Sequence, residues 1–196
     1  MSNPYAQRRQ RAMALIGGGT AVFTSAPRVV MHNDVEHPFR QDSNFYYLTG
    51  FNEPEAVAVL TPQHEEHPFV LFVRPKDPEK ETWSGYRVGV EAAKERYGAD
   101  QVYPIGELEE HLSKYLEKAD RLYYHFGHNQ ALNQTILHHW QRLLSTYHKR
   151  GTGPVAIEDA GLLMQTLRRV KTPEELDSLR QAIAISAKAH NQARSI

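Results

Sequence analysis

Short apolar runs alternate with amphipathic stretches along most of the chain, and this alternation limits the possible folds more than any other feature of the sequence. Short runs rich in β-branched and aromatic residues are typical of buried strands. We expect such strands at Ala21–Phe23, Glu55–Thr61, Pro68–Arg74, Arg121–Phe126 and Pro154–Ile157. The polar segment Pro62–His67 joins two of these runs closely enough for a hairpin. Strands that alternate with helices indicate an α/β fold, here a mixed sheet flanked by helices.

The amphipathic stretches predict the helices that cover this sheet. They lie at Val90–Tyr97, Glu107–Leu116, Asn129–Tyr147 and Asp159–Val170. In the longest of them the apolar residues recur at helical spacing: Leu132, Ile136, Trp140, Leu143, Leu144 and Tyr147. A stripe with this spacing is typical of a helix that packs against a core. We therefore interpret it as core packing and not as a site for a cofactor.

The segment Pro38–Leu60 reads PFRQDSNFYYLTGFNEPEAVAVL and predicts a compact local unit. Asp42 or Ser43 is a suitable N-cap for a short helix, and Gly50 stands where a helix ends in the left-handed conformation. The apolar run that follows continues as a buried strand. We assign no catalytic role to the charged residues of the segment, Arg40, Asp42 and Glu53, since capping and turn formation account for both carboxylates.

Charge and residue content exclude several classes of function. The 23 Lys and Arg residues balance 23 Asp and Glu residues, so the chain has no net positive field to attract nucleic acid or an anionic membrane. The absence of cysteine excludes disulfides, thiolate nucleophiles and Cys-ligated zinc, and it is compatible with a reducing cytoplasm. No stretch approaches the roughly 20 apolar residues of a membrane span. We expect neither a nucleic-acid partner nor a membrane partner.

The amino-terminal segment allows two interpretations. Three arginines precede an apolar run, and Thr24-Ser25-Ala26 offers the small residues of a cleavage site, which is the layout of an export signal. The other interpretation is a helix that is capped by Asn3, ends at Gly17-Gly18-Gly19 and leads into a strand at Thr20–Thr24. We favour the helix, because three glycines are poor helix formers and split the apolar run of the signal.

Paired histidines and the glycine run do not form a recognised catalytic motif. His64 and His67 are three residues apart in a proline-flanked loop, whereas the HExxH metal motif places its histidines four apart on a helix. We interpret the other paired histidines as surface or interface residues: His125, His128, His138 and His139. The glycine run lacks the spacing of a phosphate-binding loop.

Three stretches resemble a known family. They are NFYYLTGFNEPEA within Pro38–Leu60, ETWSGYRVG at Glu81–Gly89, and TPEELDSLRQAIAISAKAH at Thr172–His190. Each is similar to the corresponding stretch of bacterial aminopeptidase P, the Xaa-Pro aminopeptidase of the creatinase and prolidase superfamily. The resemblance covers nearly the whole chain and is most specific at the first stretch.

The resemblance implies a two-domain enzyme. Its amino-terminal α/β domain is ribonuclease-H-like, and a pita-bread catalytic domain follows. Two aspartates, a histidine and two glutamates of that second domain bind two divalent metal ions, usually manganese, which stabilise the developing oxyanion. No position of this sequence matches those ligands, so the resemblance implies that the chain alone binds no catalytic metal and is inactive.

A helix that begins at Pro173 marks the expected domain boundary. Thr172 is its N-cap, and Glu175 completes a capping box. The helix then carries an apolar stripe that needs a surface to cover: Leu176, Leu179, Ile183 and Ala187. By resemblance, residues 1–170 form the amino-terminal domain and residues 171–196 open an incomplete catalytic domain. The alternative is a helix that folds back on the first domain.

The stretch Glu81–Gly89 supplies two candidate substrate-binding residues. Trp83 stands among polar residues, which is a poor setting for a core side chain. In family members that assemble as dimers or tetramers, this stretch approaches a neighbouring subunit's active site and the tryptophan lines the substrate pocket. The resemblance therefore implies substrate contacts for Trp83, and for Arg87 with a carboxylate or carbonyl. The structural alternative is that Trp83 packs under its own loop and Arg87 pairs with Glu81 or Glu91.

The function implied by the resemblance is the amino-terminal domain of a manganese-dependent Xaa-Pro aminopeptidase, which releases the first residue of peptides with proline second. In such an enzyme the domain builds a homo-oligomer and restricts access to the metals, and we expect a cytoplasmic location. Two alternatives stay open. Prolidase shares the architecture but takes Xaa-Pro dipeptides, and a free-standing domain would be a non-catalytic binding or assembly module.

Overall fold

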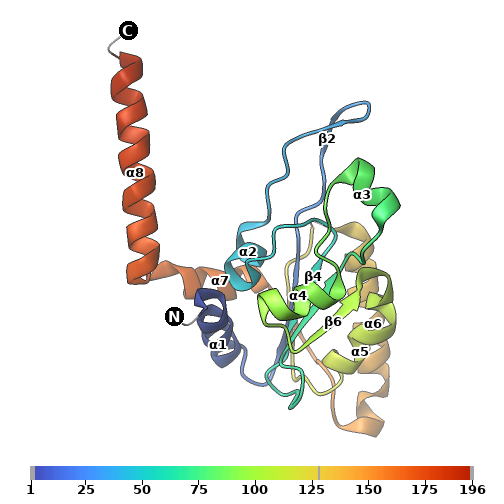
Figure 1. Cartoon of the computed structure of the whole chain (residues 1–196). Coiled ribbons are helices and arrows are strands. Elements are labelled where there is room, and N and C mark those ends of the chain that lie inside the picture. The colour runs from blue at the N-terminus through green and yellow to red at the C-terminus, as the bar shows by residue number, and fades with distance from the viewer. Residues whose placement is uncertain (1–2, 128, 195–196) are drawn as a thin grey trace. The chain divides into compact units, whose positions relative to one another are not determined.

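The structure is a computed structural model that describes residues 3–127 and 129–194, and it has the mixed α/β fold that the sequence predicts (Figure 1). The chain divides into two compact units, residues 1–164 and 165–196. The first unit contains every strand of the described residues and most of the helices. The expected domain boundary after residue 170 stays a prediction.

In the described part of the chain, six strands form one mixed sheet in the order β6-β5-β4-β1-β7-β8. Their bounds are β1 (Thr20–Thr24), β4 (Val57–Leu60), β5 (Phe69–Val73), β6 (Gln101–Pro104), β7 (Leu122–Tyr124) and β8 (Ile157–Glu158). β4 runs antiparallel to β1 and β5, which confirms the predicted hairpin. β7 runs parallel to β1 and β8, and β6 runs parallel to β5. The sequence pattern does not predict β6, because this short edge strand, Gln-Val-Tyr-Pro, has one fully buried residue and no apolar run.

Helices α5 (Leu108–Leu116) and α6 (Gln130–Arg150) cover one face of the sheet, and a short 3₁₀ turn, η1 (Ile105–Glu107), precedes α5. Paired residues of neighbouring strands point to the same face, which here includes Val22, Val59, Val70 and Tyr124. These residues form one core with the buried residues of the two helices. The predicted stripe on α6 is confirmed at Leu132, Ile136 and Leu143. Leu144 and Tyr147 are exposed instead, because the buried face of α6 is narrower than the apolar stripe.

Helix α1 (Pro4–Ile16) lies on the other face, because its Arg9 stacks over the ring of Phe69, 4.0 Å away, and Phe69 points away from Val70. The side chain of Asn3 caps α1 by accepting a hydrogen bond from the N–H of Tyr5 at 2.9 Å. The chain then turns at the glycines and enters β1. The predicted helix and strand at the amino terminus are therefore confirmed.

The predicted local unit at residues 38–60 is also confirmed. Helix α2 (Ser43–Thr49) is capped by Asp42, whose Oδ1 accepts hydrogen bonds from the N–H groups of Asn44 (2.9 Å) and Phe45 (2.8 Å). Gly50 ends the helix in the left-handed conformation, with φ of 69°. Phe45 and Leu48 share the buried face. Helix α4 (Val90–Tyr97), which contacts β5 and β6, has the predicted bounds.

Besides β6 and the turn η1, two further parts of the first unit, a two-stranded arm and a short helix, have no counterpart in the sequence prediction. β2 (Val30–His32) and β3 (Val35–Glu36) form a two-stranded arm that projects from the sheet, and its turn contains Asn33 with φ of 49° (Figure 1). The other is helix α3 (Pro78–Ser84), which follows β5. Both elements are short and exposed, so neither produces a long apolar period in the sequence.

Helix α7 (Ala160–Arg169) spans the division between the two units, and α8 (Pro173–Arg194) makes up most of the second. The predicted capping box at the start of α8 is confirmed. Thr172 N–H donates to Glu175 Oε2 at 3.0 Å, and Glu175 N–H donates to Thr172 Oγ1 at 3.3 Å. Among the described residues, no helix combines the length and apolar character needed to cross a bilayer.

Candidate functional site

The predicted binding stretch forms the end of α3 and the loop that leads to α4. Asp77 caps α3, because its Oδ1 accepts a hydrogen bond from the N–H of Lys80 at 3.1 Å. The helix buries none of its own residues. Gly85 and Gly89 follow it with φ of 80° and 76°, values that residues with a side chain rarely adopt. The position of α3 is therefore fixed mainly by the residues at its two ends and not by packing of its own side chains.

Trp83 is 91% exposed at the end of α3. The ring therefore does not pack under its own loop, as the structural alternative required. An indole has a large apolar surface, and leaving it in water forgoes the stabilisation that burial gives. Its exposure makes the ring available to a ligand or to another protein surface. Contact between Trp83 and a substrate stays a prediction.

Arg87 is only 8% exposed, in contrast to Trp83. Its Nη1 lies 4.0 Å from Asp77 Oδ2, so the carboxylate that faces it belongs to the α3 cap and not to Glu81 or Glu91. Its Nε is buried without a hydrogen-bond partner among the described residues. The two candidates thus differ in their surroundings: Arg87 is buried next to the cap of α3, and Trp83 is exposed at the end of the helix. A contact between Arg87 and a substrate stays a prediction.

Asp77, the N-cap of α3, and Glu81 within the helix are stabilised in their charged form. Hydrogen bonds from Lys80, first from its backbone N–H, lower the pKa of Asp77 below its usual value. Desolvation acts to raise the pKa of Glu81, but backbone hydrogen bonds from Asp77 and Arg87 and the nearby Lys76 lower it overall. Both carboxylates are therefore ionised at neutral pH and hold the ends of the helix.

The arm formed by β2 and β3 is attached to α3. Arg28 bonds Glu36 across the arm at 2.6 Å and donates to the carbonyl of Ser84 in α3 at 3.2 Å. Between them these elements carry an exposed apolar surface, which we call the arm–α3 surface: Val29, Val30, Met31, Val35, Trp83 and Tyr86. Each of these side chains is more than half exposed. The only sequence signal for the arm is the turn-forming pair Asn33-Asp34.

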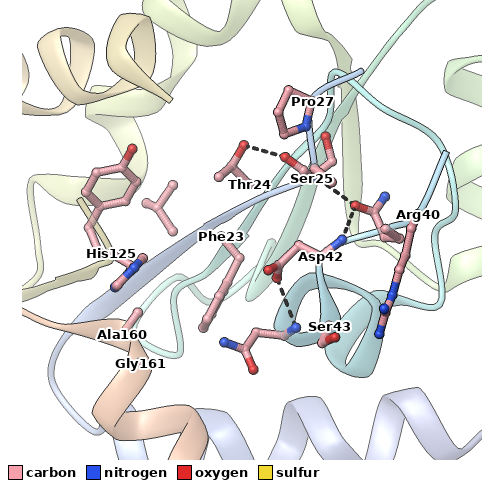
Figure 2. Close-up of a pocket in the computed structure, with 15 residues that line it drawn as sticks. Phe23, Thr24, Ser25, Pro27, Arg40, Asp42, Ser43, His125, Ala160 and Gly161 are labelled. Carbon is pink, nitrogen blue, oxygen red and sulfur yellow. Dashed lines mark hydrogen bonds between the residues drawn. The ribbon is translucent and has the colours of Figure 1, made fainter. Parts of the chain in front are cut away.

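A pocket of about 360 Å³ lies at the carboxyl ends of the parallel strands β1 and β7 (Figure 2). It is lined by the loop after β1, by residues 40–44, by His125 after β7 and by the start of α7. In Figure 2, His125 and Arg40 stand on opposite sides of it. Neither Trp83 nor Arg87 is among its lining residues. The sequence analysis did not predict the pocket, since its wall comes from four separate parts of the chain.

Hydrogen bonds to the chain itself occupy several of the polar groups of this pocket. Ser25 Oγ accepts from the N–H of Ala56 at 2.9 Å, and Gln41 Oε1 accepts from the N–H of Ala26 at 2.7 Å. His125 Nδ1 pairs with Asp159, which is not itself a lining residue, at 2.8 Å. Asp159 also accepts a hydrogen bond from the N–H of Gly161 at 2.8 Å, and the two bonds lower the pKa of Asp159. The bonds position the pocket walls, but they do not produce an activated nucleophile.

The histidines of the β4–β5 loop and one histidine of α6 are more buried than the sequence suggests, whereas His138 of α6 is exposed as predicted. His64 and His67 are half-buried with stacked rings 5.1 Å apart, and His67 Nδ1 lies 3.3 Å from the hydroxyl of Tyr115. His139 is 3% exposed, so it belongs to the interior and not to the surface. His128, which we interpreted with these residues, lies outside the described residues.

Within residues 3–127 and 129–194, no group of three or more His, Asp or Glu side chains is arranged to hold a metal ion. A two-metal hydrolytic centre needs several such ligands around each ion. No arrangement of that kind is present among the described residues.

Comparison with known proteins gives one family. Residues 5–124 match the family described as "Aminopeptidase P, N-terminal domain". The Xaa-Pro aminopeptidase of Escherichia coli K12 is 35% identical over 190 residues, which cover 95% of this chain and 43% of the relative. Xaa-Pro aminopeptidase 3 of Mus musculus is 30% identical over 201 residues, which cover 94% of this chain and 38% of the relative.

Solved structures agree with this result. Aminopeptidase PepP of Pseudomonas aeruginosa superposes with a TM-score of 0.88 at 38% identity, over 96% of this chain and 43% of that one. Proline aminopeptidase P II from Yersinia pestis superposes with a TM-score of 0.86 at 36% identity, over 97% and 44% of the two chains. The chain thus spans less than half the length of the relatives that it matches.

Proposed function

Because the chain belongs to the family of aminopeptidase P amino-terminal domains, we propose that it serves as the amino-terminal domain of a Xaa-Pro aminopeptidase. The observation that carries the proposal is the match of 95% of this chain to 43% of the Escherichia coli Xaa-Pro aminopeptidase. In the proposal, residues 1–170 form the domain and residues 171–196 begin the catalytic domain. The rest of the longer protein supplies the ligands for two manganese ions, and this chain alone is inactive.

The work of the domain in this proposal is assembly and control of access. The arm–α3 surface supports that role, because several exposed apolar side chains on neighbouring elements are a frequent mark of protein interaction sites. Trp83 would contact the peptide substrate near the active site of a neighbouring subunit in a cytoplasmic homo-oligomer. Arg87 is the second candidate. Its largely buried side chain must change rotamer or meet a closely approaching peptide to make the contact.

The experiment is the substitution Trp83→Ala in the complete protein that carries this chain. Loss of an aromatic contact of about 1.5–3 kcal/mol corresponds to a fall in kcat/KM of about ten- to one-hundred-fold for a Xaa-Pro tripeptide. The thermal midpoint should not change, since the ring is 91% exposed. The matched control is Tyr147→Ala on α6, which removes another exposed aromatic ring and should leave kcat/KM unchanged. Unchanged kinetics in Trp83→Ala would contradict the proposed substrate contact.

A further inference from the structure

Helix α3 is connected to the rest of the domain by two stems. The first stem runs from Arg74, at the end of β5, to Asp77, and the second runs from Gly85 to Gly89. Helix α3 buries none of its own residues, and its printed contact with the arm is one hydrogen bond, from Arg28 to the carbonyl of Ser84. The two stems are therefore the main support for the position of Trp83. Whatever holds both stems therefore also holds Trp83.

Glu53 contacts both stems from the loop that follows α2. Its Oε1 accepts a hydrogen bond from the N–H of Val88 in the second stem at 2.7 Å. Its Oε2 accepts one from Nη2 of Arg74 in the first stem at 3.3 Å. The side chains of Glu53 and Arg74 are only 13% and 6% exposed, so water competes little with these bonds. Charge-assisted hydrogen bonds away from water are among the stronger ones in proteins.

The loop that carries Glu53 is itself fixed. Gln41, which is 8% exposed, donates from Nε2 to the carbonyl of Phe51 at 3.1 Å and to the carbonyl of Glu53 at 2.9 Å. Phe51 is fully buried and packs edge-to-face on Tyr97 at a centroid distance of 5.0 Å. The Glu53 carboxylate thus extends from a rigid part of the core to a helix that lacks packing of its own.

We propose that Glu53 is a positioning residue for Trp83, which fixes both stems of α3 and so sets the orientation of the indole. The inference rests on the proposed function, because it assigns to Trp83 the contact with substrate. Glu53 itself touches no substrate. Its role differs from turn formation, which the sequence suggests for it, because its carboxylate bonds residues 21 and 35 positions away.

The first test measures positioning without reference to catalysis. Amide hydrogen exchange of Val88 and the NMR signal of the Trp83 indole are recorded for this chain and for Glu53→Ala, Glu53→Gln and Glu55→Gln. Loss of the Val88 acceptor in Glu53→Ala should accelerate exchange at Val88 at least tenfold and alter the Trp83 signal. Glu53→Gln should have a smaller effect, because its amide oxygen still accepts from Val88. The control Glu55→Gln changes an exposed neighbour and should have no effect.

Should Glu53→Ala fail to fold, the nearly isosteric Glu53→Gln still reports on the two stems. Wild-type exchange at Val88 together with an unchanged Trp83 signal in Glu53→Gln and in any folded Glu53→Ala would overturn the inference.

The second test asks whether Glu53 acts through Trp83. In the complete protein, Glu53→Gln should lower kcat/KM for a Xaa-Pro tripeptide about threefold or more. Adding it to Trp83→Ala should cause no further loss, since residues that act through one another are not additive. Fully additive losses would overturn the positioning role. If Trp83→Ala alone leaves kcat/KM unchanged, the proposed function fails, whereas exchange at Val88 still decides whether Glu53 positions α3.

Discussion

The burial of His139 leads us to predict how the stability of the domain depends on pH. The side chain is 3% exposed on α6, and Glu109 of α5 is among the charges near it. Neither ring nitrogen has a hydrogen bond of good geometry within the described residues, although the backbone of Glu109 lies close enough to favour the protonated ring. Burial, and then the positive charge of Arg142 and the neighbouring His138, lower the pKa of His139, while Glu109 acts in the opposite direction.

The sign follows from comparing the folded and unfolded chains. Unfolded histidine has a pKa of about 6.5, and the folded value is lower, so the unfolded state binds more protons as the pH falls below about 6.5. The free energy of unfolding therefore decreases as the pH falls below about 6.5, until the pH reaches the pKa of His139 in the folded state. Between pH 6.5 and pH 5 the loss from this one group is at most about 2 kcal/mol. At pH 7.5 the neutral ring still leaves polar atoms unpaired, which costs about 1–3 kcal/mol.

The test is urea unfolding of the wild-type chain and of His139→Leu at pH 7.5 and pH 5. The variant should be more stable at pH 7.5 and should lose less stability on acidification. His64, whose pKa is also lowered, first by burial and then by His67 and nearby lysines, leaves a residual slope in both proteins. The difference between the two slopes is therefore the relevant quantity. A variant that is less stable at pH 7.5 and keeps the wild-type slope would refute the reasoning.

Three further predictions concern α2 and the arm. Asp42→Ala removes two capping hydrogen bonds and should lower the free energy of unfolding by about 1 kcal/mol in urea, whereas Ser43→Ala should have little effect; equal losses would reject Asp42 as the cap. Gly50→Ala should cost more than 1 kcal/mol, because φ is 69° and the new Cβ would lie 2.7 Å from the ring of Tyr5; a neutral result in the same assay would contradict this geometry. Val30→Asp should lower the mass measured by light scattering if the arm–α3 surface joins subunits, while an unchanged mass would argue against that interface.

Local signals in the sequence predicted the elements whose ends are set by neighbouring residues. Asn3, Asp42 and Thr172 each cap a helix through a group no more than three residues away, so their roles follow from spacing alone. The buried strands β1, β4 and β5 were predictable for a similar reason. Each is a short apolar run that is covered on both faces.

Contacts between distant residues account for what the sequence did not reveal. Glu53 bonds Arg74 and Val88, and no spacing rule relates these three positions. The burial of His139 depends on α5 covering that part of α6. The pocket beside His125 similarly joins four parts of the chain. The exposure of Trp83 was predictable, because polar neighbours surround it in the sequence, but the stems that hold it were not.

The central proposal is that this chain serves as the non-catalytic amino-terminal domain of a Xaa-Pro aminopeptidase. The most direct measurement is an assay of the purified 196-residue chain with a Xaa-Pro tripeptide and manganese, in which mass spectrometry detects the released amino-terminal residue. The account predicts no release above a protein-free control. Release of that residue by the chain, abolished by a chelator, would contradict it.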